Sequence, residues 1–194
     1  MNRILDYLMS KLLQGGFTDS EEAEIVRYGL ELAIMRALIS AAAIIAAIAL
    51  ESAPAVIAFM AVYQPLRSCC GGYHAQKRLS CFIFSVLLLI AVITATKLLT
   101  DTVCMISSLC FTISGLNVIL FFAPVDTPTK PFDNTERIVF RKRSLIAAFF
   151  AVLSADIFML LGLDTLLLSV SMAVFFTGLL LVIGRTSNKK GAIA

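Results

Sequence analysis

The stretch LSCFIFSVLLLIAVITATKLL, residues 79–99, carries a single charged side chain, Lys97. A helix needs about 20 consecutive apolar residues to cross the hydrocarbon core of a bilayer, so this stretch predicts a membrane-spanning helix. The rest of the chain has the same character, because 59% of its 194 residues are hydrophobic and 15% are charged, whereas a soluble domain usually carries about 25% charge. The composition therefore indicates an integral membrane protein and argues against a soluble domain.

Six apolar segments follow one another along the chain, at 32–50, 53–66, 79–99, 103–123, 145–163 and 165–183. Five of them are long enough to span a bilayer. The second is short and contains Pro54 and Pro65, so we expect it to be tilted, broken or re-entrant. The sequence thus predicts an all-α, polytopic integral membrane protein, with about six transmembrane or re-entrant helices in a single membrane domain, 1–194.

Residues 1–14 have the pattern of an amphipathic helix rather than that of a span. Apolar side chains recur at helical spacing and form one stripe, which comprises Ile4, Leu5, Leu8, Met9, Leu12 and Leu13. Polar side chains, among them Arg3 and Asp6, face the other way. Such a helix is suited to lie in the membrane interface.

The positive charges are distributed unevenly along the chain. Of the 16 Lys and Arg residues, all except Lys97 fall in four stretches, 1–36, 67–78, 124–143 and 185–190. If all six segments cross, these stretches lie on one side, and cytoplasmic loops are the ones enriched in Lys and Arg. We therefore expect a multi-pass protein of the cell membrane, with both termini, the loop that contains 67–78 and the basic loop 124–143 in the cytoplasm. These charges would also attract an acidic peptide or anionic lipid.

The stretch RSCCGGYHAQKRLSCF, residues 67–82, holds the only histidine, His74, and three of the five cysteines. An imidazole beside a thiol can take the thiol proton, which creates a nucleophile, and can later protonate a leaving amine. Cys69, Cys70 and Cys81 are the candidate nucleophiles here.

The spacing between His74 and Cys81 restricts how they can meet. Seven residues are two helical turns, which put both side chains on one face but about 10 Å apart along the axis, whereas a base must lie within about 3 Å. Gly71 and Gly72 permit backbone angles that other residues avoid, so the chain can fold His74 back over a helix that begins near Ser80. Cys81 would then lie near a helix N-terminus, which lowers a cysteine pKa, as neighbouring cations also do. These cations are Arg67, Lys77 and Arg78.

Two other uses of this stretch stay open on residue types alone. Cys69, Cys70, His74 and Cys81 could together bind a metal ion, but their spacing fits no common zinc pattern, and we expect neither a metal nor a cofactor. A histidine in a basic membrane loop can also be merely solvated, and cysteines in membrane helices often only pack. The chain would then be a non-catalytic small membrane transporter, a peptide export helper or a membrane scaffold.

The stretch RSCCGGYHAQKRLSC, residues 67–81, resembles the signature of the accessory gene regulator B (AgrB) family, the membrane endopeptidases of Gram-positive quorum sensing. That signature contains an Arg, then a Gly-Gly-Tyr-His-Ala run, then a Cys seven residues after the His. A second stretch, APVDTPTKPFDNTERIVFRKRS at 123–144, is similar to the family's Ala-Pro…Asp…Lys-Pro loop and the basic sequence after it. The resemblance covers nearly the whole chain.

The resemblance implies a cysteine endopeptidase, a hydrolase that acts on an AgrD-type pro-peptide. It implies Cys81 as the nucleophile and His74 as the base, with the catalytic loop and helix start at 67–82. The C-terminal tail of the peptide would leave as a thioester forms on the enzyme, and an internal Cys or Ser would then close a thiolactone or lactone. A homodimer in the lipid membrane is also implied, with no role for nucleic acid. The supporting or substrate-binding positions would be Arg67, Gly71, Gly72, Lys77, Arg78 and Lys130.

Overall fold

The computed structural model describes residues 2–16, 23–72, 78–99, 101–125 and 133–191. Within these residues the chain is almost entirely helical, with seven α-helices and no β-strand. The chain forms two compact units, Met1–Ala42 and Ala43–Ala194. The prediction of an all-α membrane protein is confirmed.

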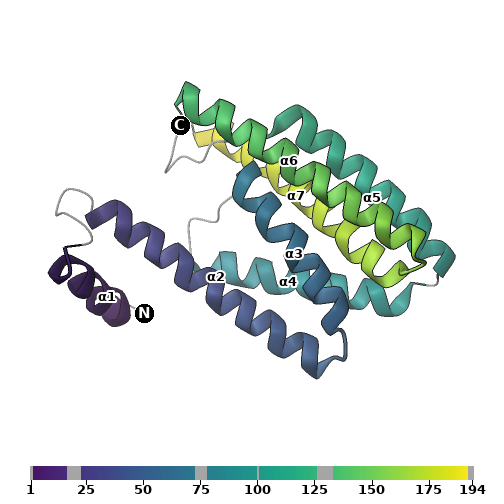
Figure 1. The fold of residues 1–194 in the computed structure, drawn as a ribbon, viewed down its shortest axis with the longest axis horizontal. Coiled ribbons are helices and arrows are strands. Elements are labelled where there is room, and N and C mark those ends of the chain that lie inside the picture. Colours follow the sequence, from purple (N-terminus) through teal and green to yellow (C-terminus); the bar gives the residue numbers. More distant parts are fainter. Residues whose placement is uncertain (1, 17–22, 73–77, 100, 126–132, 192–194) are drawn as a thin grey trace. The chain divides into compact units, whose positions relative to one another are not determined.

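The seven helices are shown along the chain in Figure 1. They are α1 (Asn2–Gln14), α2 (Ala23–Ala49), α3 (Ala53–Cys70), α4 (Arg78–Leu98), α5 (Asp101–Phe122), α6 (Asn134–Leu160) and α7 (Asp164–Gly191). Each of the helices α2 to α7 is built on one of the six apolar segments of the sequence.

Three of these helices are long and apolar enough to cross a membrane, over Thr102–Phe122, Asn134–Leu160 and Asp164–Thr186. The sequence predicts five such segments. Over its described side chains, α2 contains a shorter apolar helix, Ala37–Ala49. The described side chains of α4 form a second short apolar helix, Ile83–Leu98.

Helix α7 is the central element of the larger unit. It contacts α3, α4, α5 and α6, and Figure 1 shows it running alongside α5 and α6. Helices α5 and α7 approach closely at Gly115 and Gly178, since a Cβ on Gly115 would lie 2.6 Å from the carbonyl oxygen of Val174. Thr112 on α5 also donates a hydrogen bond of 2.9 Å to Ser171 on α7. Small residues and polar bonds of this kind hold helices together in membranes, where lipid removes the hydrophobic driving force.

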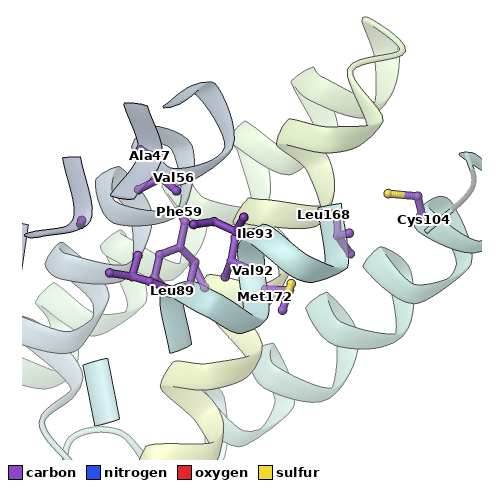
Figure 2. Close-up of a cluster of buried hydrophobic side chains, with 11 residues drawn as sticks. Ala47, Val56, Phe59, Leu89, Val92, Ile93, Cys104, Leu168 and Met172 are labelled. Atoms are coloured by element: carbon purple, nitrogen blue, oxygen red, sulfur yellow. The ribbon is translucent and has the colours of Figure 1, made fainter. Parts of the chain in front are cut away.

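Phe59 on α3 belongs to a cluster of buried side chains at which α2, α3, α4 and α7 meet. Figure 2 shows Phe59 beside Val56, Leu89 and Ile93. Its ring stacks on that of Tyr63, with the centroids 5.0 Å apart. A second cluster, which we call the turn cluster, lies where α3, α5, α6 and α7 meet. It comprises Leu66, Cys70, Ile119, Ala123, Val125, Ala148, Ala151, Val174 and Leu181.

The smaller unit holds α1 and the first part of α2. Leu5 and Met9 of the predicted apolar stripe are buried, whereas Tyr7 is exposed. Asp6 on α1 pairs with Arg27 on α2 at 2.9 Å. Both side chains are about half exposed, so this ion pair contributes at most about 1 kcal/mol to stability. The predicted helix is present, and its location at the membrane interface stays a prediction.

Candidate functional site

The candidate site begins where α3 ends. The helix continues through Pro65 as far as Cys70, so Arg67 and Cys69 lie on its last turn rather than in a loop. Gly71 follows with φ 71° and Gly72 with φ 101°, values that residues with a Cβ rarely adopt. The chain therefore turns sharply at the two glycines, which is where the sequence predicts a bend.

Two backbone hydrogen bonds tie this turn to the chain that follows α5. The N–H of Gly72 donates to the carbonyl of Val125 at 3.3 Å, and the N–H of Val125 donates to the carbonyl of Cys70 at 3.0 Å. Together they form an isolated parallel bridge between Gly71 and Val125. The Arg67 side chain, one turn back on α3, donates to the carbonyl of Gly71. The two stretches that carry the family resemblance are therefore physically joined.

The space around the turn leaves no room for larger residues at either glycine. A Cβ on Gly71 would overlap the carbonyl oxygen of Val125. A Cβ on Gly72 would lie 2.9 Å from the carbonyl oxygen of Leu180 on α7, and 3.0 Å from a guanidinium nitrogen of Arg67. The turn is thus enclosed by backbone from two other elements and by one side chain of its own helix.

Arg141 on another helix binds the end of α5 and the residue that follows it. Its guanidinium donates to the carbonyls of Leu120 and Ala123, with a longer contact of 3.5 Å to the carbonyl of Ile119. In the sequence, Arg141 is one of the cations of the stretch 124–143. In the structure it lies on α6, because that helix already begins at Asn134.

A capping box explains the early start of α6. Asp133 is the N-cap residue and Glu136 the third residue of the helix, and the N–H of Asp133 donates to the Glu136 carboxylate at 3.3 Å. Such a pair satisfies N–H groups that the first turn leaves without helical partners. The spacing Asp133-x-x-Glu136 was the signal in the sequence that could have placed Arg141 on a helix.

Cys70 is fully buried in the turn cluster. Burial raises the pKa of its thiol to about 11, although a hydrogen bond with Ser144 on α6 acts in the opposite direction. Because the thiolate is the nucleophilic form, Cys70 is poorly suited to attack a peptide bond at neutral pH. Its neighbour Cys69 is partly exposed on the last turn of α3.

The other predicted site residues are only partly visible. Cys81 lies in the first turn of α4, which begins at Arg78, but the side chains of both fall outside the described part of the structure. His74, Lys77 and Lys130 lie outside the described residues altogether. Among the residues that the structure does describe, no group of three or more His, Cys, Asp or Glu side chains could hold a metal ion.

Fold and site together define a polytopic, all-α membrane protein. In it the turn after α3 is joined by a bridge to the chain that follows α5. The model of the accessory gene regulator B family, AgrB, matches residues 1–183, and the chain belongs to this family. The family is linked to the processing of autoinducing peptides in quorum sensing, and membership implies interaction with an AgrD-type pro-peptide. No curated protein and no solved structure matches the chain.

Proposed function

We propose that this protein is a membrane cysteine endopeptidase that removes the C-terminal tail of an AgrD-type pro-peptide and promotes ring closure of the autoinducing peptide. The observation that carries the proposal is the joined turn at Gly71 and Gly72, which anchors the chain two residues before His74. The family membership supplies the substrate class.

Cys81 is the proposed nucleophile. It lies in the first turn of α4, where the partial positive charge of a helix N-terminus favours a thiolate. Cys70 carries a thiol whose pKa is raised to about 11, which argues against it as the attacking group. Among the other thiols that the structure describes, Cys69 lies beside Cys70 on the last turn of α3, and Cys104 and Cys110 lie on α5, away from the turn in sequence.

The proposed reaction has two transfers of the same acyl group. His74 takes the proton of the Cys81 thiol, the thiolate attacks the peptide carbonyl carbon, and the C–N bond breaks. The leaving amine of the tail receives that proton from His74, so that a thioester remains on Cys81. An internal Cys or Ser of the peptide then gives its proton to His74 and attacks the thioester, which closes the ring and releases Cys81.

The membrane setting favours ring closure over hydrolysis. Exchange of a thioester between two thiols changes the bonding very little, so the energy of the acyl group is retained when the nucleophile is a Cys. A site from which water is excluded protects the thioester long enough for the internal nucleophile to react. Two basic residues, Arg67 at the turn and Arg185 over the Phe122 ring at the end of α5, would attract an acidic peptide tail.

The direct test is co-expression of the chain with a candidate pro-peptide, followed by mass spectrometry of the products. We expect Cys81→Ala and His74→Ala to abolish cleavage, whereas Cys69→Ala, the matched control on a partly exposed thiol, retains it. A Cys81-linked peptide thioester trapped at low pH would support the mechanism directly. Cleavage that survives Cys81→Ala would refute the proposal as stated, and an absence of cleavage by the wild type would favour a transporter or an export helper.

We also propose that the turn faces the cytoplasm and that the protein acts as a homodimer, the commonest symmetric assembly. The distribution of Lys and Arg supports this orientation. A membrane-impermeant maleimide should label Cys69 in inside-out vesicles and not in intact cells; the reverse pattern would overturn the topology. Cross-linking of two differently tagged copies in the membrane tests the dimer.

A further inference from the structure

Arg141 on α6 donates hydrogen bonds to backbone carbonyls at the end of α5, and a role in setting membrane topology does not explain these bonds. We propose that Arg141 is a positioning residue, which holds the Gly71–Gly72 turn in place through the end of α5. The inference rests on the proposed function for its effect on the reaction, whereas its structural part can be tested without any substrate.

The first step is the bonding of the guanidinium. The last turn of a helix leaves carbonyl groups without helical partners, and such groups are costly in the low-dielectric surroundings of a membrane protein. Arg141 donates through its two terminal nitrogens to the carbonyls of Ala123 and Leu120. A planar, forked donor can reach both at once, which a lysine ammonium on a flexible stem does less well.

The second step is the short connection from these carbonyls to the turn. Val125 is two residues beyond Ala123, and both its N–H and its carbonyl are bonded to the turn, at Cys70 and Gly72. Ile119, Ala123 and Val125 also pack in the same buried cluster as Cys70. A shift of the end of α5 therefore moves Val125, the partner of Gly71 in the bridge, and uncovers the Cys70 thiol.

The third step links this arrangement to the reaction. Gly72 lies two residues before His74 in the sequence, so a displacement of the bridge displaces the chain that leads to the histidine. Arg141 bonds only backbone carbonyls in the contacts described above, and its effect on His74 and Cys81 would pass through the bridge. Misplacement of a catalytic group by about 1 Å can cost about 100-fold in rate.

The experiment compares Arg141→Ala and Arg141→Lys with Lys142→Ala. Lys142 is the adjacent exposed residue on the same helix, so its removal deletes the same charge without touching the end of α5. Each substitution is placed in two single-cysteine backgrounds, one that keeps Cys70 and one that keeps Cys104. Cys104 is buried at the other end of α5, where its thiol contacts the carbonyl of Asp164 at 3.5 Å.

The first readout is the rate of alkylation by N-ethylmaleimide in membranes. Arg141→Ala should speed labelling of Cys70 at least about tenfold, which corresponds to about 1.4 kcal/mol of local stability, and should leave Cys104 unchanged. Arg141→Lys should fall between the wild type and Arg141→Ala, and Lys142→Ala should match the wild type. Equal acceleration at both cysteines would mean general destabilisation and would overturn the inference, as would no acceleration at Cys70.

The second readout is peptide processing in the chain that retains all its cysteines. Arg141→Ala should lower kcat by about 10- to 100-fold with little change in KM, because a positioning residue acts on the placement of the reacting groups and not on substrate binding. Arg141→Lys should recover part of the loss. Processing at the wild-type rate by Arg141→Ala refutes the positioning role while the proposed function stands. If the wild type processes no peptide, the proposed function fails, and the comparison of Cys70 with Cys104 still decides whether Arg141 holds the turn.

Discussion

Replacement of Gly72 by Ala should disable the site while the protein stays folded in the membrane. The backbone at Gly72 has φ 101°, and a left-handed conformation costs an L residue about 1–2 kcal/mol. The added methyl group would also lie 2.9 Å from the Leu180 carbonyl oxygen, and overpacking of this kind costs about 1–3 kcal/mol. The sum is about 2–5 kcal/mol. Because 1.4 kcal/mol corresponds to a factor of ten, the correctly formed turn becomes at least about 30-fold less populated.

Gly162→Ala is the matched control for this prediction. Gly162 has φ 66°, which also lies in the left-handed region, but a Cβ there would meet nothing within 4 Å. It should therefore show only the backbone cost, as a small drop in the thermal stability of the detergent-solubilised protein, with peptide processing unaffected. The assay is processing in membranes, normalised to the amount of protein present. Wild-type processing by Gly72→Ala would refute the reasoning, and so would an equal loss in Gly162→Ala.

Two further predictions concern the packing of the helices and the buried thiol. Gly115→Leu should destabilise the protein by several kcal/mol, because a side chain there meets the backbone of α7 at 2.6–2.7 Å. The control Gly29→Leu should cost little, because a Cβ at Gly29 has open space around it. Thermal unfolding in detergent measures the stability of both variants. The Cys70 thiol should make the free energy of unfolding depend on pH between its ordinary pKa of 9.0 and its raised pKa of about 11. In this range the unfolded chain loses the thiol proton while the folded chain keeps it. The free energy of unfolding therefore falls as the pH rises from about 9 to about 11. Melting curves of the wild type and Cys70→Ala between pH 8 and 11 test this, and parallel curves would contradict it.

The joined turn suggests why two stretches far apart in the chain share one role. Residues 67–72 and 123–125 meet through the bridge at Val125, and each side of the bridge has its own arginine, Arg67 on α3 and Arg141 on α6. Both arginines donate to backbone carbonyls, Arg67 to that of Gly71 and Arg141 to those of Leu120 and Ala123. We propose that both arginines hold main chain in place at the site, in addition to any attraction that their charges exert on a peptide.

Much of the fold could be predicted from the sequence because membrane helices are encoded locally. Each of α2 to α7 follows an apolar segment, since a helix is the structure that satisfies its own backbone groups in lipid. The ends were less predictable. α3 continues to Cys70 beyond the predicted end of its apolar segment at 66, and α6 begins at Asn134 inside the predicted loop. Polar and charged residues are compatible with helix once they pass into the membrane interface, so hydropathy does not mark these boundaries.

The candidate site, like the fold, could be predicted from the sequence only in part. The resemblance in the sequence implied Cys81 and His74 as the reactive groups, with Arg67, Gly71 and Gly72 in support. Residue types alone left Cys69, Cys70 and Cys81 open as nucleophiles. Nothing in the order of residues showed that Cys70 is buried and carries a raised pKa, because that depends on side chains from α5, α6 and α7. Nor could the role of Arg141 be separated from that of its basic neighbours.

The sequence by itself determined that this is an all-α membrane protein with a turn at two glycines, because apolar runs and glycine backbone freedom act over a few neighbouring residues. Only the tertiary structure decided what encloses that turn. The bond partners of Gly72 and Arg141 are carbonyl groups, and every residue has one. Which carbonyl lies within reach is set by how α3, α5, α6 and α7 pack against each other. Because the carbonyl group is the same in every residue type, the sequence does not show which one is the partner.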